Sequence, residues 1–187
     1  MLLDPSRLPP VQVFTAKHFA DERGFLLQSW VQQDLAAQGI PSTFKQAIQT
    51  WSRRGVVRGL HFQWDPPMGK LVRCIHGAIL DVVVDVRVGS PTHGAHVAVE
   101  LTGRNHRVIW VPPGFAHGTF ALEEGSIVLY ECTAEHGPGR EGGILWNDPA
   151  LGIAWPDLPP IVSEKDRQAP TLAQWTADPR AQHFRYA

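Results

Sequence analysis

The segment Ile79-Leu-Asp-Val-Val-Val-Asp-Val-Arg-Val88 decides the fold, because its residues alternate with the period of two that is typical of a β-strand. The two faces of such a strand carry different residues: Asp81, Val83, Asp85 and Arg87 on one, and Val82, Val84 and Val86 on the other. The segment predicts a sheet with one apolar and one polar face, as in a barrel whose mouth holds a site.

Similar short apolar runs flank this segment, separated by Gly- and Pro-rich turns. The predicted strands are Val56–Phe62, Leu71–Ile75, His96–Leu101, Arg107–Val111, Gly118–Leu122 and Ser126–Cys132. Strands spaced by about 8–12 residues indicate a sandwich or barrel. Helix is sparse: Val31–Ala37 is the best candidate, ended by Gly39 and Pro41. We therefore predict one all-β domain over residues 1–187 with minor helix, a core over about 13–170 and an irregular tail from Leu158.

Composition excludes several classes of protein. The 187 residues carry a formal net charge of −1, which does not suggest a nucleic-acid partner. Cys74 and Cys132 lie in apolar runs and are expected to be reduced core residues. No apolar run reaches the roughly 18 residues of a membrane span, and the N-terminus lacks the pattern of a secretion signal. A cytoplasmic protein without membrane contact is expected.

The stretch Arg58-Gly-Leu-His-Phe-Gln-Trp-Asp-Pro-Pro-Met-Gly-Lys70 places a base and two cations around a predicted strand–turn–strand. Such a set suits the removal of a proton from a carbon next to a carbonyl, because a cation stabilises the negative charge that develops on oxygen. In a regular strand His61 and Arg58 would point to opposite faces, but a twist or bulge at Gly59 could bring them together.

Other candidates each have an ordinary structural interpretation. His117 lies in a loop that enters a strand, and Tyr130 ends an apolar run, where it is either a core residue with a solvated hydroxyl or a general acid. Asp166 lies in a turn-like segment. Asp81 and Asp85 on a Val-rich strand need partners, because half-buried carboxylates are costly alone.

A metal or cofactor site is not predicted. His76, His93, His96 and His106 lie near turns at irregular spacing, and the chain contains no His-x-His followed by Glu. It contains no Gly-x-Ser-x-Gly motif of serine hydrolases either.

Several motifs in order resemble the nucleotide-sugar 3,5-epimerases, the family of the enzyme that acts on dTDP-4-dehydro-6-deoxyglucose in rhamnose synthesis. The resemblance runs from about Val13 to Pro170, and its motifs include Arg58-Gly-Leu-His-Phe-Gln, Gly69-Lys-Leu-Val-Arg, Trp110-Val-Pro-Pro-Gly-Phe-Ala-His-Gly and Ile144-Leu-Trp-Asn-Asp-Pro. It implies a metal-free cupin-type jelly roll, and a homodimer in which an N-terminal segment of one subunit completes the site of the other.

The same resemblance implies residue roles. His61 looks like the base, Asp166 like the carboxylate that orients it, Lys70 like the cation facing the enolate oxygen, and Tyr130 like the acid on the opposite face of the sugar. Further residues look like substrate contacts: Arg58, His117, Gln46, Glu141 and Lys165 in the same subunit, and Arg23 and Phe25 reaching across the dimer.

Departures from the family pattern gather where the nucleotide base would bind. This chain has Gln28 in place of Glu, Gln46-Ala-Ile in place of Gln-Asp-Asn, and His136 in place of a Tyr that stacks on thymine. Gln28 still forms hydrogen bonds and His136 still stacks, but Ala47 and Ile48 cannot replace a carboxylate and an amide. The resemblance thus implies a nucleotide-linked 4-ketosugar, with dTDP favoured and the base left open. The alternatives are a 3,4-ketoisomerase of similar fold and a sugar-binding cupin without catalysis.

Overall fold

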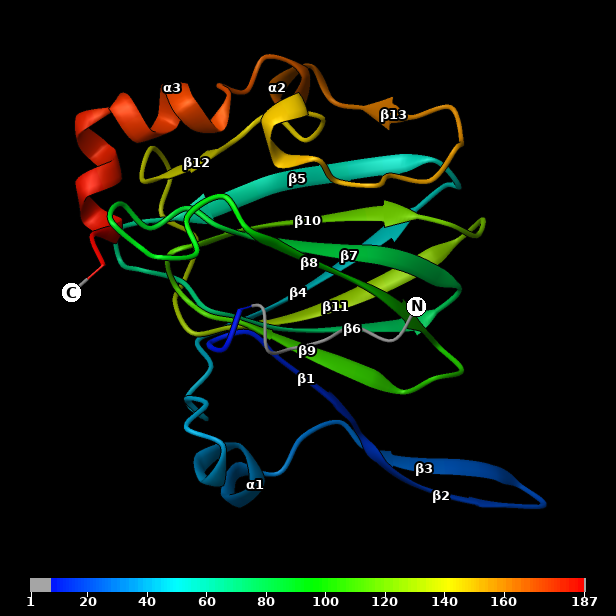
Figure 1. The fold of residues 1–187 in the computed structure, drawn as a ribbon. Helices are drawn as coiled ribbons and strands as arrows, with labels where there is room; N and C mark the ends of the chain where they lie inside the picture. The colour runs from blue at the N-terminus through cyan, green and yellow to red at the C-terminus, as the bar shows by residue number, and fades with distance from the viewer. Residues whose placement is uncertain (1–7, 187) are drawn as a thin grey trace.

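The computed structural model describes residues 8–186, and they form two facing antiparallel sheets with a separate hairpin (Figure 1). The first sheet has the order β1-β9-β6-β11-β4. Its strands are β1 (Gln12–Thr15), β9 (Arg107–Val111), β6 (Lys70–His76), β11 (Ser126–Cys132) and β4 (Gln46–Ser52).

The second sheet has the order β12-β5-β10-β7-β8, and β13 adds to β5 in parallel. Its strands are β12 (Glu141–Gly143), β5 (Val56–Gln63), β10 (Phe115–Ala121), β7 (Ala78–Asp85), β8 (His96–Thr102) and β13 (Ile161–Val162). The hairpin consists of β2 (Lys17–Asp21) and β3 (Gly24–Gln28), which pair only with each other. The predicted all-β jelly-roll fold with minor helix is confirmed.

The main apolar core lies between the two sheets. It combines inward side chains of both, among them Val72 and Cys74 of β6, Ile79 and Val83 of β7, and Ile109 of β9. Burying such side chains contributes about 1.5–3 kcal/mol each, so this layer stabilises the fold strongly. Cys74 and Cys132 are both buried and unpaired, as expected.

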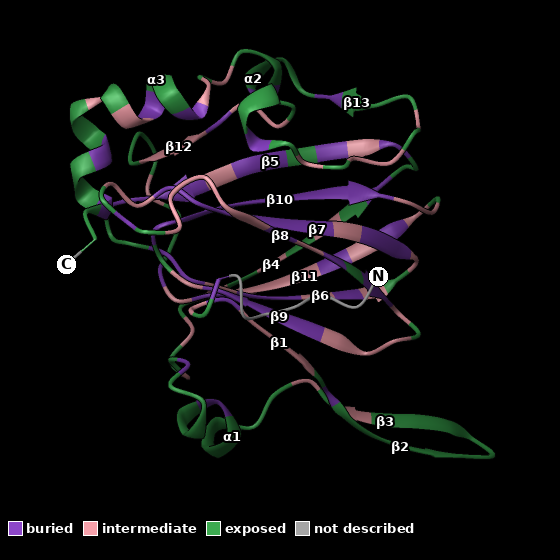
Figure 2. Ribbon diagram, in the orientation of Figure 1, coloured by how far each residue is buried: buried purple, intermediate pink, exposed green. Residues whose placement is uncertain are grey.

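The two predicted faces of Ile79–Val88 are present: Val83 and Asp81 lie on the inward face, where Asp81 pairs with His117, and Val82 and Val84 lie on the other face. Strand β7 ends at Asp85, and both of its faces are buried (Figure 2). Val82 and Val84 pack outward against a second apolar cluster that contains Trp175 and Phe184 from the end of the chain. The second face is therefore buried because the C-terminal segment covers it.

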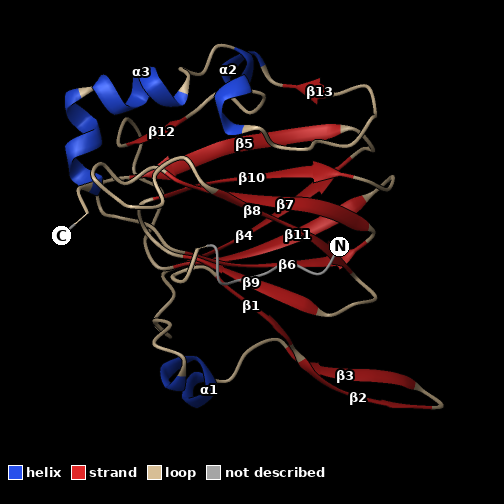
Figure 3. Ribbon diagram, viewed as in Figure 1, coloured by secondary structure: helices blue, strands red, loops and turns tan. Residues whose placement is uncertain are grey.

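The prediction of an irregular tail was also wrong. The chain beyond Leu158 forms β13, α2 (Glu164–Arg167), α3 (Leu172–Ala177) and the 3₁₀ helix η3 (Pro179–Phe184), which lie on the outer side of the second sheet (Figure 3). Thr171 caps α3 through a capping box with Gln174. The core thus extends past residue 170.

Two further boundaries matter for the site. Strand β10 begins at Phe115 rather than Gly118, because Phe115, Ala116 and His117 pair with β7, so His117 lies within a strand and not in a loop. Helix α1 (Gln32–Ala37) agrees with the predicted helix to within one residue. No helix within residues 8–186 is both long and apolar enough to cross a membrane.

Candidate active site

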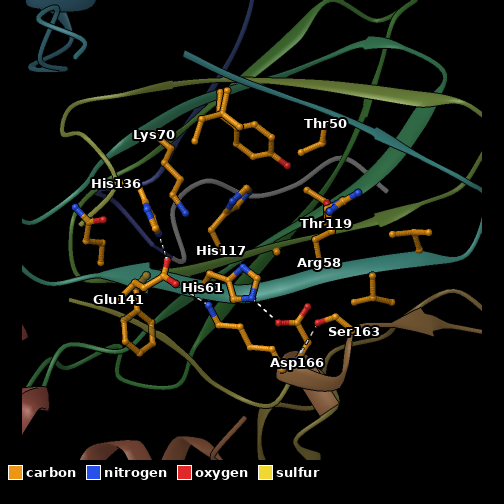
Figure 4. Close-up of a pocket in the computed structure, with 18 of the residues that line it drawn as sticks. Thr50, Arg58, His61, Lys70, His117, Thr119, His136, Glu141, Ser163 and Asp166 are labelled. Atoms are coloured by element: carbon orange, nitrogen blue, oxygen red, sulfur yellow. Dashed lines mark hydrogen bonds and ion pairs between the residues drawn. The ribbon is translucent and has the colours of Figure 1, made fainter. Parts of the chain in front are cut away.

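A cavity of about 520 Å³ lies between the two sheets, lined by residues of β4, β6 and β11 in the first and of β5 and β10 in the second (Figure 4). It brings together most of the predicted site residues, which come from β5, β6, β10, β11, β12, α2 and the loop between β11 and β12: Arg58, His61, Lys70, His117, Tyr130, His136, Glu141, Lys165 and Asp166. Residues 60 or more positions apart in sequence therefore meet in one pocket.

A bulge at Gly59 allows Arg58 and His61 to line the same pocket. Strand β10 pairs His117 with His61 but Thr119 with Arg58, so one extra residue of β5 is accommodated between them. Gly59 has a φ of 128°, and a Cβ there would lie 2.5 Å from Gly118 Cα. Glycine is needed for the conformation and for the close approach of β10.

His61 forms a pair with Asp166. Its Nε2 lies 2.5 Å from Asp166 Oδ1, and its side chain is 37% exposed while that of Asp166 is 6% exposed. Burial by itself would raise the pKa of Asp166, but hydrogen bonds with His61, Ser163 and the Gly59 backbone hold it below its usual value. An ionised carboxylate only accepts, so His61 Nε2 donates and Nδ1 of the neutral ring keeps a lone pair for a proton.

The one-turn helix α2 sets the position of Asp166. Ser163 caps this helix, and its Oγ accepts a hydrogen bond from the Asp166 N–H at 3.1 Å. Strand β13, just before the cap, pairs with β5 at Val56 and Val57. The carboxylate and the imidazole that it orients are thus held on adjacent segments.

Lys70 enters the pocket from β6 in the opposite sheet. Burial lowers the pKa of Lys70, whereas the charges of Cys132, Asp81 and Glu141 oppose that shift. Its ammonium forms no ion pair with any described residue. A half-buried cation without a partner stabilises a nearby oxyanion more strongly than a solvated one.

Tyr130 lies on β11, in the same sheet as Lys70 and across the pocket from His61. Burial, with the negative charge of Asp81 adding to it, raises the pKa of Tyr130 to about 12. Its ring is 5.9 Å from that of His117, edge to face. The phenol therefore keeps its proton at neutral pH, as a proton donor must.

Asp81 was not among the predicted site residues, although it forms a second His–Asp pair in the pocket wall. His117 Nε2 lies 2.8 Å from Asp81 Oδ2, and both side chains are buried. The signal was present in the sequence, since a carboxylate on a Val-rich strand needs a partner, but the partner lies 36 residues away on β10.

A polar chain crosses the pocket mouth (Figure 4). Gln46 Oε1 accepts from the His136 backbone N–H at 2.9 Å, His136 Nε2 lies 2.9 Å from Glu141 Oε2, and Lys165 Nζ lies 2.7 Å from Glu141 Oε1. Gln46 itself stands beside the pocket rather than in its wall. Arg58 Nε donates to Ser52 Oγ at 3.1 Å, which ties β5 to β4.

Three predicted substrate contacts do not reach this pocket. Arg23 and Phe25 lie on the projecting hairpin, where Arg23 pairs with Asp21, and Gln28 lines a separate groove beside α1. Within one chain they lie apart from the site. As for metals, no group of three or more His, Cys, Asp or Glu side chains within residues 8–186 is placed to hold an ion.

Comparison with known proteins gives the family. The family model described as dTDP-4-dehydrorhamnose 3,5-epimerase matches residues 5–174. This chain belongs to that family. A dTDP-4-dehydrorhamnose 3,5-epimerase from Salmonella typhimurium is 45% identical over 177 residues, which cover 93% of this chain and 97% of the relative.

Solved structures of family members share the whole fold. The epimerase from Legionella pneumophila, determined with dTDP-4-keto-L-rhamnose, has a TM-score of 0.92 and 36% identity, and covers 100% of this chain and 98% of its own. A 3'-monoepimerase from Streptomyces bikiniensis, determined with dTDP-quinovose, has a TM-score of 0.84 and 33% identity over 88% of this chain and 85% of its own. The chain is thus an epimerase that acts on a sugar nucleotide.

Proposed function

We propose that this epimerase inverts C3, C5 or both carbons of a dTDP-linked 4-keto-6-deoxyhexose through an enolate. One observation carries the proposal: His61 on the second sheet, paired with Asp166 of α2, faces Lys70 and Tyr130 on the first sheet across a single pocket. Each proton transfer in the reaction uses a side chain of this protein.

Proton removal is the first step. The C4 ketone acidifies the hydrogens on C3 and C5, and His61 Nδ1 accepts one of them while the electron pair moves onto the ketone oxygen. Lys70 faces that oxygen and stabilises its negative charge, an effect worth about 3–4 kcal/mol per donor in comparable sites. Asp166 stabilises the imidazolium that forms at His61.

Proton return on the other face inverts the carbon. Tyr130 stands on the opposite sheet from His61 and carries its proton at neutral pH. It donates that proton to the enolate carbon, which restores the ketone with the opposite configuration. Acid and base each contribute about 10²–10⁴-fold to such a reaction.

The remaining pocket residues serve binding. The buried Asp81 orients His117, whose imidazole faces the pocket for a sugar hydroxyl, and Arg58 provides a cation for the diphosphate. His136, Glu141 and Lys165 at the mouth offer polar contacts to the nucleotide end. These roles follow from position and charge, together with the family resemblance.

The nucleotide preference is tested with a panel of dTDP-, CDP-, GDP- and UDP-linked 4-ketosugars in D₂O, with exchange scored by mass. We expect the dTDP sugar to exchange most efficiently, and dTDP to bind at least about tenfold tighter than the others by calorimetry, which corresponds to about 1.4 kcal/mol. Ala47, Ile48 and His136 differ from the family pattern, and each hydrogen bond to a buried base group that is lost costs about 1–3 kcal/mol. A tenfold preference for dTDP must therefore come from the other contacts of the nucleotide. Tighter binding of another nucleotide would reassign the substrate while leaving the chemistry in place.

The oligomeric state gives a second prediction. Phe19, Phe25 and Leu26 are 53%, 60% and 62% exposed on a hairpin that projects from the body, and edge strand β4 exposes Trp51. Such apolar surface fits a second copy that receives Arg23 and Phe25 in its site. We expect light scattering at micromolar concentration to give about twice the 20.7 kDa chain mass. A fully active monomer would contradict the shared site.

A further inference from the structure

His106 occupies the turn between β8 and β9, opposite the point where the hairpin leaves the body. Thr15, the last residue of β1, pairs with Arg107, the first residue of β9. The next residues, Ala16 and His106, therefore face each other at the junction. The buried Ala16 donates its N–H to the His106 carbonyl at 2.9 Å.

The His106 ring contacts both strands of the hairpin. Its centroid lies 4.6 Å from that of His18 on β2 and 4.9 Å from that of Phe25 on β3. One side chain of the body thus touches both hairpin strands. Because β2 and β3 pair only with each other, no strand ladder fixes the direction in which the hairpin projects (Figure 1).

The remaining described attachments lie on the chain after the hairpin turn. Arg73 Nη1 donates to Ser29 Oγ at 2.5 Å, and Leu27 packs at the edge of an apolar cluster with Ala16 and Leu35. These contacts hold the end of β3. The direction of β2 depends on its junction with His106.

The backbone of His106 is held in an unusual conformation. Its φ is 54°, the only positive φ of a non-glycine residue among those the structure describes. Glycine and asparagine adopt this left-handed region readily, and histidine does so more often than most other residues, so the turn accepts any of the three.

We propose that His106 is a positioning residue that sets the direction of the β2–β3 hairpin, and so places Arg23 and Phe25 for the site of a second copy of the chain. The part that concerns the second site rests on the proposed shared-site function. The part that concerns the hairpin rests on the contacts of His106 alone.

The charges around His106 make this anchor sensitive to acid. The charged groups that act on it are His18 on β2 and Arg73 on β6, and both are basic. Burial, then His18 and then Arg73, lowers the pKa of His106. The anchored hairpin therefore binds the proton less readily than a released one, and anchoring should weaken as the pH falls below the ordinary histidine range near about 6.5.

The experiment compares wild type with His106→Asn and His106→Gly, both of which accept the left-handed backbone and remove the ring contacts. His93→Asn serves as the control, because it removes an imidazole from the turn before β8, far from the hairpin. Limited trypsin digestion, with mass identification of cleavage at Lys17–His18, the bond beside the His106 contacts, measures how often the base of the hairpin opens. Steady-state kinetics then gives KM and kcat for the nucleotide sugar.

We expect both His106 variants to be cleaved at Lys17–His18 about fivefold faster or more, since two ring contacts are lost. KM should rise by a similar factor with kcat within about twofold, because His106 touches no reacting atom, and His93→Asn should match wild type. Cleavage at the wild-type rate would overturn the anchor, and faster cleavage with unchanged KM would overturn its role in positioning. The digestion needs no substrate, so it tests the anchor whether or not the proposed function is correct. An error in the proposed function would appear instead as a wild-type protein that does not convert the nucleotide sugar.

Discussion

Replacing His61 by Asn should lower the rates of deuterium exchange and of epimerisation by about 10²–10⁴-fold, the usual contribution of a general base. Asparagine cannot accept the proton at neutral pH, while its amide can still donate to Asp166. The His61 side chain is 37% exposed, so the substitution leaves the core intact. Mass spectrometry of substrate recovered from D₂O measures the exchange directly.

The control for this variant is His76→Asn, which removes an exposed imidazole from the end of β6. It should exchange at the wild-type rate. Asp166→Asn should have an intermediate effect, because it leaves the base in place but removes the charge that stabilises the imidazolium. Exchange at the wild-type rate in His61→Asn would remove His61 from the role of base.

Replacing Tyr130 by Phe should separate exchange from inversion. The variant keeps the ring in its packing and loses only the phenolic proton, so His61 still removes protons and returns them to the same face. We expect deuterium to enter the recovered substrate while formation of the inverted product falls by about 10²–10⁴-fold. NMR of the sugar ring distinguishes the two outcomes.

The chain provides a matched control in its second tyrosine. Tyr186→Phe alters a phenol that lies over Arg87 near the C-terminus, with ring centroid and guanidinium carbon 4.9 Å apart. It should give the wild-type yield of inverted product. A normal yield in Tyr130→Phe would mean that another group returns the proton.

The sequence predicted correctly the strands that are marked by their own apolar residues and by the turns on either side. Arg107–Val111 and Ser126–Cys132 agree with β9 and β11 at both ends. The motif around His61 and Lys70 also predicted a shared pocket, because a short turn joins two strands that fold over one cavity. The bulge that brings Arg58 to the same pocket lies at Gly59, the position from which it was expected.

Features that depend on distant segments were not predicted. The outer face of β7 is buried in a cluster that includes Trp175 and Phe184, which lie about 90 to 100 residues later in the chain. Asp81 meets His117 only through the pairing of β7 with β10. The short strand β12 has a sequence, Glu141-Gly-Gly, without any strand propensity, and it exists because β5 offers it an edge.

The measurement that tests the central claim most directly is NMR of the wild-type reaction with dTDP-4-dehydro-6-deoxyglucose in D₂O. If His61 and Tyr130 act from opposite faces, the product should be inverted at C3, C5 or both, and every inverted carbon should carry deuterium from the solvent. The relatives include both 3,5-epimerases and a 3'-monoepimerase, so the product also gives the number of carbons inverted. An inverted product that keeps its original hydrogen, a carbonyl moved to C3, or bound sugar without any exchange would each contradict the account.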